Sequence, residues 1–271
     1  MNRQHLHRRI AMGTLILGLS ALVPGTGTQA DDLIGHGGRG GYQNPLAFPA
    51  GALPYGASLA EWQALDWQSY MAKPYDPEAC VLGPVGRFGS THDVLHLNVS
   101  LGTPVEYTCT IPTGMALLVP VVTTMYLCPL TCGPGTIAPN GTVEELDAAA
   151  NADIDLVSRL EVEIDGRLLP GLFGYRTTSP AFSGEAVPGN VLDPLVVGPY
   201  GPAVAAGYYV MLPPLPAGDH VIRVLGVLGD PPIYEFLSLF NLTVGPGPAG
   251  LTVATLPVAE STWGAVKSLF K

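Results

Sequence analysis

Positive charge is scarce in this sequence. The 271-residue chain holds 12 Lys and Arg against 22 Asp and Glu, a net charge of −10, and only 13% of its residues are charged. Nucleic-acid binding depends largely on Lys and Arg that neutralise phosphates, and anionic membrane surfaces attract clusters of the same residues. The composition therefore argues against nucleic acid and against an anionic membrane surface as partners.

Long apolar segments are also lacking after the N-terminus. Residues 1–30 join a basic start, MNRQHLHRRI, to the short apolar run AMGTLILGLSALV and end in small residues before Asp31. This order is typical of a signal peptide cleaved after Ala30, because the apolar run falls short of the about 20 residues that span a membrane. An uncleaved anchor is the alternative. Cleavage removes three Arg and no acid, which leaves 9 basic and 22 acidic residues, a net charge of −13.

Cysteine is infrequent, and all four cysteines lie in the predicted mature chain, at Cys80, Cys109, Cys128 and Cys132. An even number of cysteines in an exported protein predicts disulfide bonds, and four residues allow three pairings. We favour Cys128–Cys132, which closes CPLTC, with Cys80–Cys109 joining two distant segments. Zinc is disfavoured because the Cys-x-x-x-Cys spacing has no His nearby, and a redox-active pair because C-x-x-C is absent.

Catalytic signatures are missing from the sequence. It contains no G-x-S-x-G, no H-E-x-x-H and no P-loop. The best metal candidates are His92 and His96, which would share one face of a strand, with His220 as a third ligand. Histidines at this spacing are more often ordinary surface or core residues, so we favour no metal site and no cofactor. Asp153 and Asp155 lack the rest of a calcium loop and are expected on the solvated face of a helix.

Glycine and proline are abundant, at 34 and 27 residues, while hydrophobic residues make up 47% of the chain. Such a composition predicts a turn-rich protein that still has enough apolar material for a core. Residues 31–55 form a Gly- and Pro-rich arm. Capping boxes at Ser58-x-x-Glu61 and Thr142-x-x-Glu145 predict helices over residues 58–72 and about 142–157.

The remaining segments favour β-strands. Short runs rich in β-branched and aromatic residues are separated by turn signals, and they cover residues 94–101, 105–111, 115–127, 160–164, 208–215, 220–228 and 236–244. Asp165-Gly166 is a strong hairpin signal, because this dipeptide tolerates the positive φ angles of a tight turn. These features predict one mainly β domain over residues 56–245, an antiparallel β-sandwich of jelly-roll or immunoglobulin-like type with one or two peripheral helices.

Aromatic and cationic residues in this domain offer weak ligand-binding candidates. Trp62, Trp67 and Tyr70 lie near Asp66 and are suited to stacking on a sugar ring, although large aromatics on a helix more often fix it to the core. Arg87 and Arg176 stand out because cations are so few. Each suits either an anionic ligand or a buried carboxylate, and the structural pairing is the favoured role.

The order of motifs resembles a group of exported bacterial proteins with a Trp-rich N-terminal helix, a C-x-x-P-x-G segment and a C-terminal G-x-H-x-I strand. The corresponding segments here are GASLAEW from Gly56, Cys80, CTIPTG from Cys109, Asp165-Gly166, YRTTSP from Tyr175, GDHVI from Gly218 and NLTV from Asn241. The likeness covers roughly residues 50–245 and departs from the pattern at residues 91–93. It implies one exported β-rich domain and brings no activity or catalytic residues with it.

The C-terminal segment, residues 246–271, begins with a Gly- and Pro-rich linker. Beyond it, Trp263, Val266, Leu269 and Phe270 recur at helical spacing and predict a short amphipathic tag read by a sorting component, or a tail folded back on its own domain. The sequence as a whole favours an exported, extracellular, periplasmic or cell-surface module that is non-catalytic and binds a glycan or protein or has a structural role. A secreted hydrolase or lyase with a carboxylate or histidine site is the alternative.

Overall fold

The computed structural model describes residues 46–84, 94–99 and 102–246. Its helical segments are η1 (Pro54–Gly56), α2 (Leu59–Met71), α3 (Val143–Ile154) and η2 (Leu172–Tyr175). The strands are β1 (Val81–Pro84), β2 (Val94–Leu97), β3 (Val105–Pro112), β4 (Ala116–Leu127), β5 (Val157–Ile164), β6 (Arg167–Leu168), β7 (Arg176–Thr178), β8 (Phe182–Ala186), β9 (Gly198–Leu212), β10 (Gly218–Leu228) and β11 (Tyr234–Gly245).

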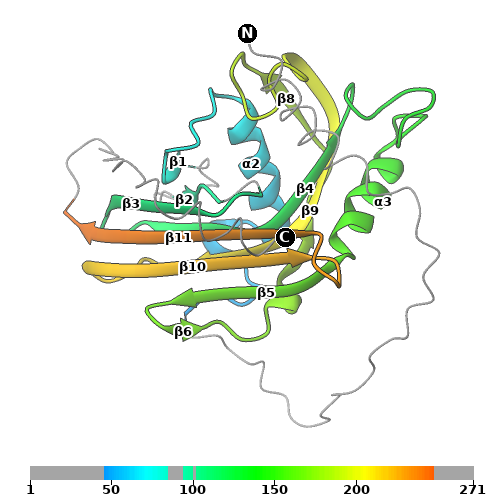
Figure 1. The fold of residues 1–271 in the computed structure, drawn as a ribbon. Helices are drawn as coiled ribbons and strands as arrows, with labels where there is room; N and C mark the ends of the chain where they lie inside the picture. Colours follow the sequence, from blue (N-terminus) through cyan, green and yellow to red (C-terminus); the bar gives the residue numbers. More distant parts are fainter. Residues whose placement is uncertain (1–45, 85–93, 100–101, 247–271) are drawn as a thin grey trace, which may run out of the picture.

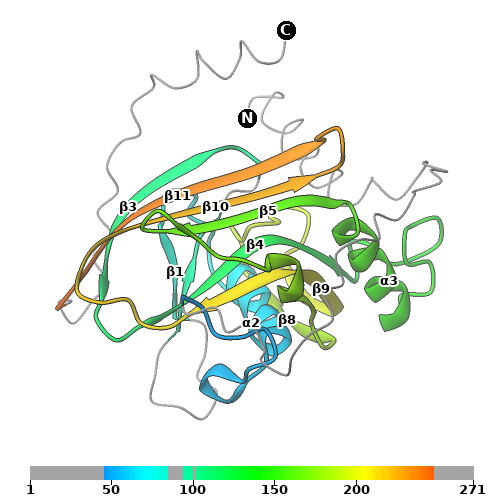
Figure 2. The same cartoon turned by 90° about the horizontal axis from the view of Figure 1, so that it is seen from below.

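These strands form a sandwich of two sheets (Figure 1). The six-stranded sheet has the order β1-β2-β4-β9-β7, with β8 also beside β9, and the five-stranded sheet has the order β3-β11-β10-β5-β6. Figure 2 shows the five-stranded sheet as one layer, β4 and β9 in the next, and α2 on the far side of these two strands. The mainly β sandwich with two peripheral helices that the sequence predicts is therefore confirmed.

The sheets are mixed, whereas the sequence predicted antiparallel ones. Most neighbours pair antiparallel, but β2 pairs parallel with β4 and β3 pairs parallel with β11. The path of the chain explains why β2 and β4 are parallel. Strand β3, which connects them, lies in the other sheet, so the chain crosses over and returns in the same direction. Parallel neighbours need such a crossover, and no local sequence signal marks it.

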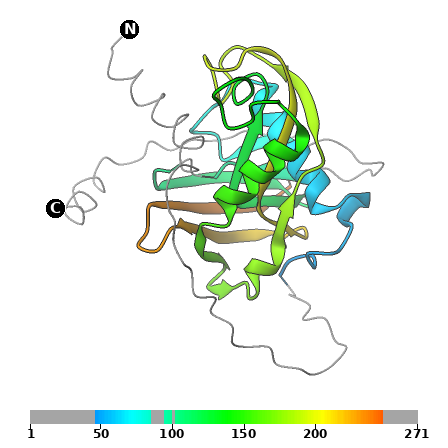
Figure 3. The same cartoon turned by 90° about the vertical axis from the view of Figure 1, so that its right-hand side faces the viewer.

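Both predicted helices begin at their capping boxes. The Ser58 hydroxyl accepts from the Glu61 N–H, and the Glu61 carboxylate accepts from the Ser58 N–H; Thr142 and Glu145 repeat the arrangement. Helix α2 covers the outer face of the six-stranded sheet, and α3 lies at one end of the sandwich, in front of the sheets in Figure 3.

One expectation for α3 is wrong. Asp153 was expected on the solvated face of the helix, but it is only 7% exposed, because this side of α3 packs over β4. Its carboxylate accepts hydrogen bonds from Tyr126 Oη at 2.7 Å and Thr124 Oγ1 at 3.4 Å. Burial raises the pKa of Asp153, and these two hydrogen bonds offset part of the rise.

The core fills the space between the two sheets. The inner face of the five-stranded sheet contributes Ile222, Val224 and Phe240, and β4 contributes Val122 from the other side. Gly226 lies where the sheets approach closely, since a Cβ there would meet Val122 Cγ2 at 2.1 Å. Glycine is needed at this contact because no side chain fits between the two backbones.

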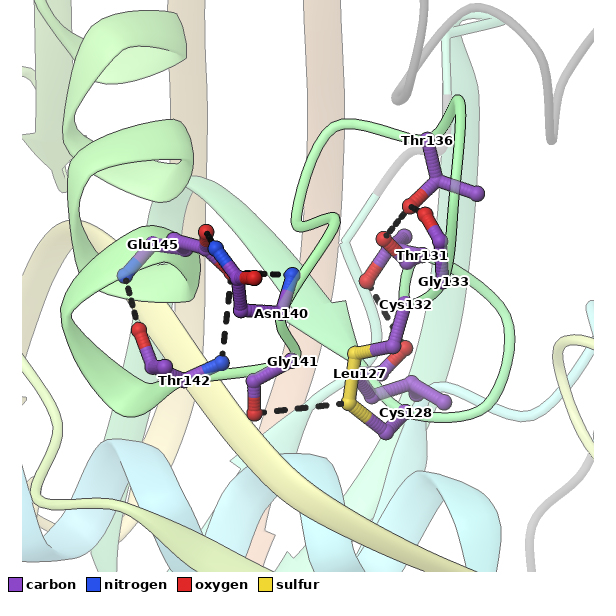
Figure 4. The surroundings of a disulfide bond; sticks show 10 residues. All are labelled: Leu127, Cys128, Thr131, Cys132, Gly133, Thr136, Asn140, Gly141, Thr142 and Glu145. Atoms are coloured by element: carbon purple, nitrogen blue, oxygen red, sulfur yellow. Dashed lines mark hydrogen bonds between the residues drawn. A yellow bond between two sulfur atoms is a disulfide. The ribbon is translucent and has the colours of Figure 1, made fainter.

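Both disulfides predicted from the sequence are present. Cys80–Cys109 joins the segment before β1 to β3 of the opposite sheet, and Cys128–Cys132 closes the loop after β4. Figure 4 shows the second disulfide beside the start of α3, where Gly141 has φ +67° and a Cβ would lie 3.4 Å from Cys128 Sγ. Glycine at this position combines the left-handed backbone with the close approach to sulfur.

The hairpin signal is confirmed as well. Asp165 and Gly166 have φ angles of 51° and 75° and connect β5 to β6. No helix within the described ranges has the length and apolar character needed to cross a membrane. The predicted leader at residues 1–30 and the predicted tag within residues 247–271 lie outside the described residues, as do His92 and Arg87.

Candidate functional site

The largest gathering of polar side chains lies under α2. Spacings of three and four residues place Gln63, Asp66, Trp67 and Tyr70 on one stripe of the helix, which faces the six-stranded sheet. All four are buried. A carboxylate and an amide on a buried helix stripe need polar partners, because burying either without hydrogen bonds costs free energy.

The sheet supplies these partners from three strands. We call the resulting cluster the α2 network, and its members are Gln63, Asp66, Trp67, Tyr70, His96 of β2, Thr123 of β4 and Tyr209 of β9. Their chain separations reach 143 residues, the distance in sequence between Asp66 and Tyr209. The network is therefore assembled by the fold and not by any local motif.

Asp66 is the charged centre of the network. Its Oδ2 accepts a hydrogen bond from Tyr209 Oη at 2.8 Å, and its Oδ1 lies against His96 Nδ1. The side chains of Asp66 and His96 are both 0% exposed. The carboxylate thus orients the imidazole through Nδ1, which is how an aspartate orients the base of a catalytic triad.

Thr123 organises the other half of the network. Its Oγ1 accepts from Trp67 Nε1 at 3.1 Å and from Gln63 Nε2 at 3.4 Å, and it lies 3.0 Å from Tyr209 Oη. It also donates to the carbonyl of Ala206 at 3.3 Å. One hydroxyl therefore joins the helix to both central strands of the six-stranded sheet.

Tyr70 and Tyr209 stay protonated and act as hydrogen-bond donors throughout the ordinary pH range. Burial, together with the negative charge of Asp66, raises the pKa values of Tyr70 and Tyr209 well above 10. Tyr70 Oη donates to Asn98 Oδ1 at 3.3 Å, and Asn98 Nδ2 donates to the carbonyl of Ala79 at 2.8 Å. This chain extends the network to the segment that carries the disulfide cysteine Cys80.

One ring nitrogen of His96 has no partner among the described residues. Its Nε2 is buried and makes no hydrogen bond with the residues that the structure describes, and neither does Gln63 Oε1. The Tyr70 ring lies edge-on to the imidazole, with 5.0 Å between centroids. An oriented histidine can act as a base only if a reacting group reaches its free nitrogen, and here that nitrogen is sealed inside the protein.

The other metal candidate that the structure describes, His220, lies elsewhere. His220 is the third residue of β10 in the five-stranded sheet. It contacts Asp165 with Nδ1 at 2.7 Å and the carbonyl of Pro216 with Nε2 at 3.0 Å. It is therefore in a different sheet from His96. Within the described ranges, no group of three or more His, Cys, Asp or Glu is arranged to hold a metal ion.

The predicted ligand-binding residues have structural contacts. Trp62 is 0% exposed and its Nε1 donates to the carbonyl of Pro54 at 3.1 Å, and Trp67 and Tyr70 belong to the α2 network. Arg176 donates to Asp155 Oδ1 at 2.6 Å and to Asn151 Oδ1 at 3.0 Å, which ties β7 to the end of α3. The Arg176 side chain remains 35% exposed, so Arg176 and Asp155 form a partly exposed ion pair at the surface.

Sequence reasoning missed part of the α2 network. Tyr209, Thr123 and Gln63 were not candidates, and Asp66 was noted only as a neighbour of the aromatics. The usable signal was Gln63 and Asp66 themselves, because two polar residues on the stripe of a helix that also carries Trp67 and Tyr70 predict buried partners.

A scan against protein-family models and searches of curated proteins and of solved structures find no match for this chain, so its function has to be argued from the geometry of its own residues.

Proposed function

We propose that this chain is an exported, non-catalytic β-sandwich module, stapled by two disulfides, with a binding or structural role at the bacterial cell surface. The proposal that the module is non-catalytic rests on the complete burial of Asp66 and His96 in the α2 network. Its aspartate and histidine have the orientation of an acid–base pair but no exposure at all. A hydrogen-bonded polar cluster of this kind fixes the position of a helix on a sheet, which is a structural role.

The pairing of the cysteines supports an oxidising compartment. All four cysteines form disulfides, which leaves none of them free. Stable disulfides are usual outside the cytoplasm and rare within it. Together with the leader-like residues 1–30, this supports export.

A secreted hydrolase or lyase is the second candidate, and one observation favours it. Asp66 holds His96 by Nδ1 and leaves Nε2 without a described partner, as in an enzyme whose base awaits a substrate. For this function, α2 would have to move off the sheet and expose the imidazole. The two proposals therefore differ in whether His96 meets solvent in the native protein.

Histidine modification distinguishes them. The native full-length protein is treated with diethyl pyrocarbonate, and the modified histidines are identified by peptide mass spectrometry. The non-catalytic proposal expects His96 to stay unmodified in the native protein and to react once the protein is unfolded. Modification of native His96 at a rate similar to that in the unfolded protein would overturn the sealed arrangement and favour the enzyme.

Export has its own test. Expression in a bacterial host of the full chain, and of a variant that lacks residues 2–30, is followed by cell fractionation and non-reducing peptide mapping. The proposal expects the full chain outside the cytoplasm with both disulfides formed, and the variant retained inside with free thiols. Equal distribution of the two proteins would contradict export.

A further inference from the structure

Strand β3 leaves one long edge of the sandwich unpaired within the described part of the chain. It is the outer strand of the five-stranded sheet and pairs only with β11, in parallel register from Val105 opposite Ser238 to Pro112 opposite Gly245. Figure 1 shows β3 at the margin of this sheet, beyond β11. An unpaired strand edge presents a row of N–H and C=O groups to any extended segment that reaches it.

This edge differs from the others in the molecule. The edge strands β1, β6 and β7 are only four, two and three residues long, and β8 has five, whereas β3 has eight. Proteins protect long edges with charges, bulges or prolines. In β3 the only charged residue is Glu106, the pairing with β11 has no bulge, and Pro112 is its last residue.

The chain leaves the five-stranded sheet next to this edge. Because β11 and β3 run parallel, both end on the same side, and the Thr113 N–H donates to the carbonyl of Gly245 at 3.0 Å. Residues beyond Gly245 start one strand away from the unpaired edge. Reaching the far side of β3 means crossing two strand spacings, about 10 Å.

The sequence after β11 fits this path. The connector PGPAG at residues 246–250 spans up to about 17 Å when extended, which exceeds the crossing distance. It is followed by LTVATL at residues 251–256, an uncharged run with three β-branched residues that ends before Pro257. β-Branched residues favour strands, and a following proline ends the pairing.

We propose that residues 251–256 of the same chain add to the sheet as a strand, antiparallel to β3 along its outer edge. The direction follows from the path, since a chain that leaves the end of β11 and turns back runs opposite to β3. Main-chain hydrogen bonds supply the attachment, as in other cases of strand addition to a sheet edge. Residues 261–271, with their apolar residues at helical spacing, would then emerge from one fixed position on the sandwich.

Amide hydrogen exchange of the full-length protein tests this proposal. Only about half of the β3 amides point toward β11, so without an added strand the other half is open to exchange. The proposal expects slow exchange in both halves for the wild type, measured residue by residue over 105–111. Val253→Pro should accelerate the outward half at least tenfold, because proline removes a ladder hydrogen bond.

Thr262→Pro is the matched control, since it places the same residue in the tail but beyond the proposed strand. It should leave β3 unchanged, and amides of β10 should be unchanged in both variants. Fast exchange of the outward half in the wild type, or no effect of Val253→Pro, would overturn the proposal. Protection that rises with protein concentration would also overturn it, because the added strand would then come from a second copy.

Discussion

Two aspartate–histidine pairs occur among the residues that the structure describes, and their surroundings are opposite. Asp66 and His96 lie under α2 with side chains that are both 0% exposed, whereas Asp165 and His220 lie at the end of the five-stranded sheet, 43% and 11% exposed. His220 has an acceptor at each ring nitrogen, the Asp165 carboxylate and the Pro216 carbonyl. His96 has its carboxylate on one nitrogen and no described partner on the other.

The difference between the two pairs shows that burial determines how an aspartate–histidine pair contributes to stability. Around His220 the charged imidazolium is favoured, because it donates to both acceptors and water screens its charge. Under α2 both side chains are 0% exposed, so bulk solvent does not screen them and each group depends on the others. Breaking a buried pair is therefore expensive, while breaking a surface pair costs little.

The largest expected effect comes from breaking the buried pair. Asp66→Ala removes the partner of His96 and Tyr209 together, and it should lower the free energy of unfolding by about 3–5 kcal/mol. Chemical denaturation of purified protein measures the loss. Asp165→Asn, at the surface pair, is the control: asparagine tolerates the positive φ of this turn position, and the variant should cost at most about 1 kcal/mol. Equal losses in the two variants would show that burial does not separate the pairs.

The Cys80–Cys109 disulfide provides a second test of this comparison, because it is connected to the network that contains the buried pair. The Asn98 N–H donates to the Cys80 carbonyl at 2.9 Å, which ties the disulfide to the α2 network. Replacing both cysteines by serine should cost about 2–5 kcal/mol and lower the melting temperature. The control replaces Cys128 and Cys132, whose disulfide spans 4 residues instead of 29 and should stabilise less, because a shorter loop loses less chain entropy. The reverse order would contradict this account.

A smaller loss of stability is expected when the Tyr209 hydroxyl, which donates to Asp66, is removed. Tyr209→Phe keeps the ring and removes the hydrogen bond to Oδ2, so it should cost about 1–3 kcal/mol. Tyr234→Phe on β11 is the control, since the Tyr234 hydroxyl makes no hydrogen bond with the described residues. Thermal and chemical denaturation of both variants should show a loss only for Tyr209→Phe. A loss below that of the control would mean that Asp66 does not need this donor.

Local signals in the sequence were sufficient for much of the fold. The capping boxes predicted both helices, and Asp165-Gly166 predicted the hairpin. Strand β9 is longer than predicted, because the stretch GPYGPAVAAG from Gly198 has the composition of a turn, yet it pairs with β4 and β8 as strand. Pairing with neighbouring strands overrides local preference in such a segment.

The candidate site was less predictable, for a physical reason. A helix or strand motif places residues a few positions apart, but Asp66, His96 and Tyr209 meet only because α2 packs across strands of one sheet. The sequence offered His220 as a third ligand beside His92 and His96, but His220 lies in the other sheet from His96. Composition also gave no warning that Asp153 would be buried, since its burial depends on where α3 lies over β4.

The smallest expected effect concerns the surface pair and its dependence on pH. Burial acts against protonation of His220, but the hydrogen bonds to Asp165 and Pro216 outweigh it and raise the pKa of His220 above 6.5. The pKa of Asp165 is lowered: burial acts to raise it, and the hydrogen bonds from His220 and the Val221 N–H outweigh that effect.

A raised histidine pKa gives stability that is complete below about pH 6.5 and is lost as the pH rises through the folded-state value. A lowered aspartate pKa gives stability that is present above about pH 4 and is lost as the pH falls through its folded-state value. The pair therefore contributes most between about pH 4 and 6.5. His220→Gln should cost up to about 1 kcal/mol at pH 5.5 and progressively less toward pH 9, as measured by chemical denaturation at the two pH values. A cost that stays constant or grows toward alkaline pH would mean that His220 stabilises the protein through packing and not through its charge. The surface pair and the buried pair would then differ only in where they lie in the fold.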